Sequence, residues 1–150
     1  MDKIESFKIN HNTLKEGIYI SRIDGDVITY DLRTRKPNQG DFMDNETMHS
    51  VEHMFASLIR NSKISDSVLY FGPMGCQTGF YLLCKENKET VLEVVIDVLK
   101  KIIAYNGEVF GNTPLECGNY KTLSLEKAKL ECQRYLDILL NKVNDFKYEE

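Results

Sequence analysis

The dipeptide Asp24-Gly25 lies between two stretches rich in β-branched and aromatic residues, at positions 18–23 and 27–32. An Asp-Gly pair tolerates the positive φ angles that a two-residue hairpin turn requires. We therefore expect an antiparallel β-hairpin over residues 18–32. Whatever else the chain forms, at least two of its strands must be neighbours running in opposite directions.

The remaining segments are assigned from their length and hydrophobic periodicity. Strands are expected at residues 4–9, 68–71 and 79–84, and helices at about 45–61, 90–104 and 124–143. The segment from 90 to 104 is apolar almost all round, which predicts a well-buried helix. Strands and helices do not alternate as βαβ units. This order favours an α+β fold in which an antiparallel sheet packs against helices.

Composition limits both size and partners. A chain of 150 residues with 42% hydrophobic residues predicts one globular domain spanning 1–150. A net charge of −4 argues against nucleic acid as a partner, and no apolar run approaches the length of a membrane span. The first residues lack the apolar core of a signal peptide. We therefore expect a cytoplasmic protein whose four cysteines are reduced.

The helix expected to be capped by Asp44 or Asn45 carries His49, Glu52 and His53. At about 100° per residue these three side chains share one face, whereas Val51 and Phe55 lie opposite and can pack into a core. The order His-x-x-Glu-His is the inverted form of the zinc-peptidase signature. It places two imidazoles toward one ion and leaves a carboxylate free to act as a base.

A divalent ion needs a third protein ligand, and three ligands leave one position open for water or substrate. Cys117 is a candidate, because it lies in a glycine-flanked loop, Glu116-Cys117-Gly118, that can bring a thiolate to the helix. The alternative is a histidine pair on a solvated helix face that holds no ion.

Cys76 lies in the segment from 72 to 79, which contains three glycines and a proline and must turn sharply. A cysteine displayed by such a turn can be reactive, and a nearby cation would favour its thiolate. The alternative is a small apolar filler in the turn. Cys84 and Cys132 lie in apolar patterns and are expected in the core.

Together these motifs resemble the S-ribosylhomocysteine lyase (LuxS) family. The resemblance covers nearly the whole chain and rests on Glu5-Ser6-Phe7, His11, Asp31-Leu32-Arg33, Pro37-Asn38, His49 through Ala56, Arg60, Pro73 through Tyr81, and Cys117-Gly118-Asn119-Tyr120. It implies metal ligands His49, His53 and Cys117, a general base at Glu52, an acid/base thiol at Cys76, and substrate contacts from Ser6, His11, Arg33 and Arg60. It also implies one divalent ion per chain, Fe²⁺ with Zn²⁺ or Co²⁺ able to replace it, and a homodimer with active sites at the interface.

The reaction implied by the resemblance converts S-ribosylhomocysteine to homocysteine and 4,5-dihydroxy-2,3-pentanedione, the autoinducer-2 precursor, by carbonyl migration and β-elimination. One departure from the family concerns Tyr70-Phe71-Gly72, where many relatives have Asp-Ile-Ser. Substrate affinity or identity is the property that this change puts in question. Two alternatives remain open: a non-catalytic or substrate-shifted relative that binds metal and a sugar thioether, and a metallohydrolase.

Overall fold

Four antiparallel strands form a single sheet in the order β1-β2-β4-β3 in the computed structural model, which describes residues 1–149. The strands are β1 (Gly17–Asp24), β2 (Val27–Arg33), β3 (Val68–Pro73) and β4 (Gly79–Cys84), and the helices are α1 (Glu5–Lys8), α2 (Asn45–Ile59), α3 (Lys88–Ala104) and α4 (Leu125–Leu140). The predicted hairpin is confirmed, because β1 pairs with β2, but the turn is shifted by one residue. Asp24 pairs with Val27, so the two turn residues are Gly25, with a φ angle of 62°, and Asp26, rather than Asp24 and Gly25. The α+β prediction is confirmed as well.

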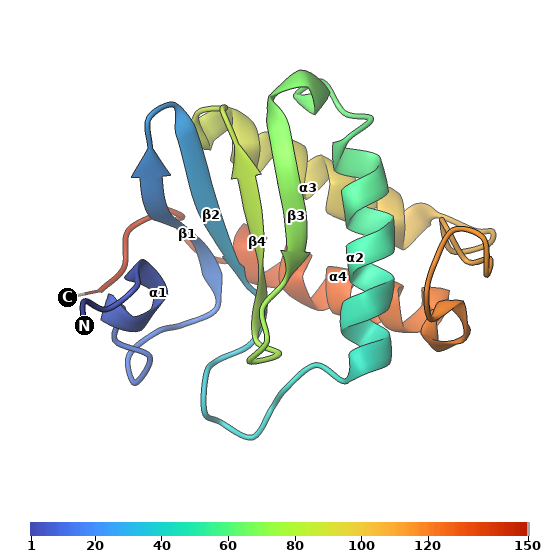
Figure 1. Cartoon of the computed structure of the whole chain (residues 1–150), viewed down its shortest axis with the longest axis horizontal. Coiled ribbons are helices and arrows are strands. Elements are labelled where there is room, and N and C mark those ends of the chain that lie inside the picture. Colours follow the sequence, from blue (N-terminus) through green and yellow to red (C-terminus); the bar gives the residue numbers. More distant parts are fainter. Residues whose placement is uncertain (150) are drawn as a thin grey trace.

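Helices α2, α3 and α4 pack together on one side of the sheet, and α2 also runs along the β3 edge (Figure 1). The core between these layers contains apolar side chains from every strand and from all three helices. The opposite face of the sheet, called here the outer face, is approached by the short helix α1 beside β1 and by the C-terminal segment. Within residues 1–149, none of the helices has both the length and the apolarity needed to cross a membrane.

Two sequence predictions are wrong in detail. Residues 4–9 do not form a strand, because Glu5–Lys8 make one helical turn in which Lys8 forms an ion pair with Glu5. Helix α3 is not buried all round: Val91, Val95 and the other apolar residues of one face are buried, whereas the charged residues Glu93, Asp97 and Lys100 are exposed. Since Cys84 and Cys132 are buried, their assignment to the core is confirmed.

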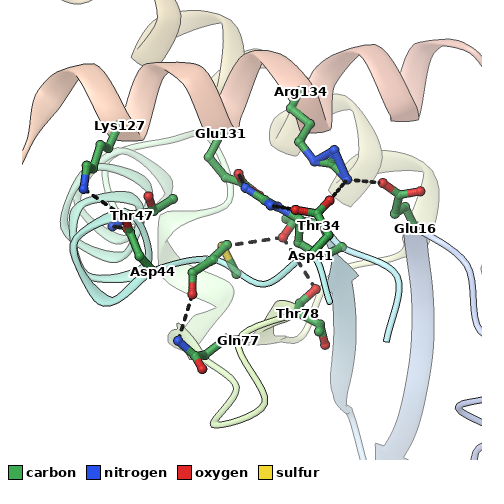
Figure 2. Close-up of polar contacts among 12 residues, drawn as sticks. Glu16, Thr34, Asp41, Asp44, Thr47, Gln77, Thr78, Lys127, Glu131 and Arg134 are labelled. Atoms are coloured by element: carbon green, nitrogen blue, oxygen red, sulfur yellow. Dashed lines mark hydrogen bonds and ion pairs between the residues drawn. The ribbon is translucent and has the colours of Figure 1, made fainter. Parts of the chain in front are cut away.

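The segment that joins β2 to α2, residues 34–44, is held against α4 by ion pairs (Figure 2). Arg35 binds Glu131 through two hydrogen bonds, from Nε at 3.1 Å and from Nη2 at 2.5 Å. Asp41 of the same segment pairs with Arg35 and with Arg134, and Arg134 also binds Glu16. The carboxylate of Glu131 is only 3% exposed. The connection is therefore tied to the helix layer before α2 begins.

We expect Arg35→Met to lower the free energy of unfolding by about 3–5 kcal/mol, because it leaves the buried carboxylate of Glu131 without a partner. The double variant Arg35→Met/Glu131→Met should recover most of this loss. Lys63→Met, which breaks an exposed pair with Glu93, serves as the control and should change stability much less. Denaturant unfolding measures all three. If Arg35→Met lowers the free energy of unfolding no more than the control does, Arg35 does not stabilise the buried carboxylate of Glu131.

Candidate metal centre and active site

Helix α2 is oriented by its apolar face. Val51, Met54, Phe55 and Ile59 are buried, and Asp44 caps the helix by accepting a hydrogen bond from the backbone N–H of Thr47. With that face fixed, the opposite side of the helix carries His49, Glu52 and His53, all of them partly exposed. The predicted two-sided helix is confirmed.

The predicted third ligand also reaches this face of α2. The donor atoms of His49, His53 and Cys117 lie within 4.8 Å of one another. Cys117 Sγ is 3.3 Å from His49 Nε2, close to the separation of about 3.5 Å expected for a thiolate and an imidazole on one tetrahedral ion. These three side chains can hold one divalent ion and leave its fourth position open.

The hydrogen bond on the far side of each imidazole decides which nitrogen faces the ion. His53 Nδ1 lies 2.8 Å from the carbonyl oxygen of Phe110. A carbonyl can only accept, so Nδ1 carries the proton and Nε2 keeps its lone pair. Gly111 has a φ angle of 72°, and a Cβ there would lie 3.1 Å from His53 Nδ1, so glycine keeps this carbonyl within reach of the ring.

In His49, as in His53, a hydrogen bond at Nδ1 leaves Nε2 free, but here the acceptor is a side chain. Its Nδ1 lies 2.6 Å from Thr122 Oγ1, while the Thr122 hydroxyl donates to the carbonyl of Asn119 at 3.0 Å. Because the Thr122 proton is used there, the hydroxyl oxygen accepts from His49 Nδ1 and leaves Nε2 free for a metal. Burial, together with the neighbouring His53, lowers the pKa of His49 below its usual value. Both features favour the neutral imidazole that a metal requires.

Glu52 lies on the same face of α2 as the two histidines, and no hydrogen bond joins it to either within residues 1–149. Its side chain lines a groove of about 700 Å³ together with His53, Phe71 and Phe110. It also lines a second groove, of about 320 Å³, on the side of His49 and Pro73. Within residues 1–149 no hydrogen bond engages its carboxylate, so Glu52 is available to a bound molecule in either groove.

Cys76 is exposed at the tip of the β3–β4 turn. The next residue, Gln77, has a φ angle of 65°, a left-handed conformation that is unusual outside glycine. Two bonds with Met43 hold it there: the Met43 N–H donates to the Gln77 carbonyl at 3.0 Å, and Gln77 Nε2 donates to the Met43 carbonyl at 2.8 Å (Figure 2). The anchored 34–44 segment thus fixes the turn that presents the thiol.

The thiol of Cys76 lies close to the guanidinium of Arg33, and the Thr78 hydroxyl contacts both groups. Arg33 Nη1 donates to Thr78 Oγ1 at 2.8 Å and approaches Cys76 Sγ at 3.8 Å, while Thr78 Oγ1 is 3.0 Å from the same sulfur. Since the Thr78 oxygen accepts from Arg33, its proton can point at the sulfur. Burial lowers the pKa of Arg33, but the charge and hydrogen bond of Asp31 outweigh it, so the net shift is upward. Arg33 therefore stays charged beside the thiol.

The remaining predicted substrate-binding residues are spread around the sheet. Ser6 belongs to the short helix α1, which contacts β1. His11 follows α1 and bonds the carbonyl of Ile9 through Nδ1 at 2.9 Å. Arg60, at the end of α2, donates to the carbonyls of Val68 and Leu69. Along the helix it is about 10 Å beyond His53.

Tyr70 and Gly72 lie close together on β3. Tyr70 is half exposed, and its ring lies over Gly72: a Cβ at Gly72 would be 2.0 Å from the Tyr70 hydroxyl oxygen. A side chain at position 72 would therefore require the Tyr70 ring to move.

Sequence reasoning missed the residues that support this chemistry. Thr122 and the Phe110 carbonyl fix the two imidazoles, and Thr78 and Asp31 position Arg33. A backbone carbonyl leaves no signal in a sequence. Asp31 did leave one, because residues two apart on a strand share a face, which puts Asp31 beside Arg33.

An α+β domain that gathers two imidazoles, a thiolate and an uncoordinated carboxylate at one point has the features of a metal-dependent enzyme. The chain matches the S-ribosylhomocysteinase (LuxS) family over residues 4–146 and belongs to that family. It is 42% identical to S-ribosylhomocysteine lyase of Finegoldia magna, with 94% of each chain covered. Proteins of the same name from Borreliella afzelii and Clostridium beijerinckii are each 40% identical, with 99% and 94% of each chain covered, respectively.

The Thr122 contact can be tested separately from ligation. Thr122→Val should weaken metal affinity about 10- to 100-fold, because His49 Nδ1 loses the acceptor that fixes its tautomer. Cys117→Ala should lose most of the metal outright. Thr13→Val, which removes an exposed hydroxyl bonded to Asn10, is the control and should keep it all. Metal content after dialysis against a graded chelator gives the order, and equal retention by Thr122→Val and the control would contradict the role of Thr122.

Proposed function

We propose that this chain cleaves S-ribosylhomocysteine to homocysteine and 4,5-dihydroxy-2,3-pentanedione. The observation that carries the proposal is the convergence of His49, His53 and Cys117 beside the free carboxylate of Glu52. It is supported by the family match over nearly the whole chain and by the activity in the names of the relatives. We also propose a cytoplasmic location, where thiols such as Cys76 and Cys117 stay reduced.

The proposed ion is Fe²⁺, with Zn²⁺ or Co²⁺ able to replace it, held by His49, His53 and Cys117. Imidazole and thiolate ligands favour these ions over Mg²⁺ or Ca²⁺. When bound, the ion supplies Lewis acidity that stabilises negative charge on the sugar oxygens.

The protein side of the reaction is proton transfer. The carbonyl of the open sugar moves from carbon 1 to carbon 2 and then to carbon 3, and each move takes a proton from one carbon and returns one to its neighbour. In the final step carbon 4 loses a proton and the homocysteine thiolate leaves carbon 5. Glu52 and the Cys76 thiolate are the proposed acid/base groups. Arg33 Nη1 and the Thr78 hydroxyl both contact the Cys76 sulfur.

Substrate contacts are proposed for Ser6, His11, Arg33 and Arg60. His11 follows α1, which contacts β1, whereas the ligands His49 and His53 lie on α2, which contacts β3 at the other edge of the sheet (Figure 1). Four strands at about 4.8 Å spacing separate those edges by roughly 14 Å. This separation favours a site in which His11 meets the metal ligands of another chain rather than those of its own.

A homodimer with active sites at the subunit interface resolves this separation. The exposed side chains of α1 and β3 include several large apolar ones, Ile4, Phe7, Leu69 and Tyr70. Their burial against a second copy would be favourable, and it would place α1 of one chain near α2 of the other. Each site would then combine the metal ligands of one subunit with Ser6 and His11 of its partner.

We expect Glu52→Gln and Cys76→Ala to keep near-stoichiometric metal while losing at least about a hundredfold in turnover, the scale of a positioned acid/base group. The assay uses purified, Fe²⁺-loaded protein under anaerobic conditions and follows the thiol of released homocysteine. Cys132→Ala, which alters a buried thiol away from the site, is the control for loss of a cysteine.

Near wild-type turnover by Cys76→Ala would disprove the proposed acid/base role of that thiol. Full metal content without any turnover by the unmodified protein would instead favour a non-catalytic relative that binds metal and a sugar thioether.

Shared sites predict complementation between inactive variants. After subunit exchange, a mixture of Glu52→Gln and His11→Ala chains should recover up to about a quarter of wild-type activity, because half the dimers are mixed and each has one intact site. Glu52→Gln mixed with His53→Ala provides the control: both defects fall on the metal side, so no site is restored. Light scattering at a mass of 17.3 kDa, that of one chain, would rule out the dimer.

A further inference from the structure

The last described residues return to the sheet. The backbone N–H of Ile20 donates to the carbonyl of Phe146 at 2.9 Å, and Phe146 is buried. Two residues later, the ring of Tyr148 stacks on Tyr19, with centroids 4.8 Å apart and planes 18° apart. Figure 1 shows this C-terminal segment beside β1. Tyr148 lies beyond the part of the chain that matches the family, which ends at residue 146.

The Tyr148 hydroxyl reaches a buried ion pair. It donates to Asp31 Oδ2 at 2.7 Å, and the same oxygen accepts from Arg33 Nη2 at 2.7 Å. Asp31 is fully buried and Arg33 is 1% exposed. Asp31 Oδ2 therefore accepts two hydrogen bonds, one from Arg33 on the same strand and one from Tyr148 in the C-terminal segment.

Asp31 and Arg33 share one hydrogen bond rather than two. Asp31 Oδ1 and Arg33 Nε are both buried, and within residues 1–149 neither has a hydrogen-bond partner. A carboxylate and a guanidinium commonly form two parallel hydrogen bonds. Here only one forms, and Arg33 Nη1 is directed to Thr78 and Cys76 instead.

We propose that Tyr148 is a positioning residue: by holding Oδ2 of Asp31, its hydroxyl fixes the carboxylate that anchors Arg33 Nη2 and so keeps Arg33 Nη1 on Thr78 and Cys76. This inference rests on the proposed acid/base role of Cys76. It gives the C-terminal segment an effect on the reaction without a contact to substrate.

Other titratable groups around Asp31 and Arg33 stay neutral near pH 7. Burial, aided by the charge of Asp31, raises the pKa of Tyr19 to about 12 and raises that of Tyr148, Tyr81 and Tyr135. The charged groups beside Tyr19 include Asp145, Glu149 and Lys142, whose Nζ lies 5.6 Å from the centre of the Tyr19 ring. Arg33 is the cation in contact with Cys76 Sγ.

The test compares Tyr148→Phe with the unmodified protein by the rate at which iodoacetamide alkylates Cys76 between pH 5 and 10, read on the Cys76 peptide by mass spectrometry. Loss of the hydroxyl frees the carboxylate that anchors Arg33 Nη2, so the guanidinium is no longer held at the sulfur. The pH at which half the maximal rate is reached should rise by about half a unit to one unit. Turnover should fall severalfold near pH 7 and partly recover at higher pH.

Tyr19→Phe is the matched control, because it removes a hydroxyl from the same stacked pair, one that donates to the Lys15 carbonyl at 2.8 Å. Its alkylation midpoint should equal that of the unmodified protein. Tyr148→Leu, which removes the ring as well, should shift the midpoint in the same direction as Tyr148→Phe.

An unchanged midpoint in both Tyr148 variants would overturn the inference, even if their melting temperatures fall, because Tyr148 would then be merely structural. Alkylation needs no turnover, so this outcome is distinct from failure of the proposed function, which Cys76→Ala tests.

Discussion

The packing of one face of α2 into the core is the interaction on which the site depends. It sets the direction of His49, Glu52 and His53 on the other face. The same packing anchors the loop that brings the third ligand. Ser50, fully buried on α2, accepts a hydrogen bond from the backbone N–H of Ser124 at 2.7 Å, where α4 begins. The helix thus places its own ligands and fixes the end of the segment that contains Cys117 and Thr122.

The parts of the site that could be predicted from sequence are those determined locally. Two histidines one turn apart require only that residues 45–59 be helical, and the buried Val51 and Phe55 specify which way that helix faces. The hairpin needed only Asp24-Gly25 and its flanking apolar residues. Cys117 was a candidate because of its glycine-flanked loop, although nothing local fixed its distance to α2.

What could not be predicted depends on contacts between distant segments. Residues 4–9 resemble a short strand, yet they form one helical turn beside the edge strand β1 and do not pair with it. Asp31 and Arg33 are neighbours on β2, but the third member of that group, Tyr148, lies 117 residues along the chain from Asp31. In α3, the charged positions 93, 97 and 100 did signal a solvent-exposed face, and the apolar content of the segment obscured it.

The two histidines differ in how evolution can alter them. The acceptor for His49 is the Thr122 hydroxyl, which many single substitutions remove. The acceptor for His53 is the Phe110 carbonyl, a backbone group that every amino acid at that position would supply. Substitution of Thr122 can therefore remove the acceptor of His49. The acceptor of His53 is altered mainly by substitution of Gly111, whose φ of 72° few other residues adopt. Variation among homologous sequences should accordingly be wider at position 110 than at its neighbour.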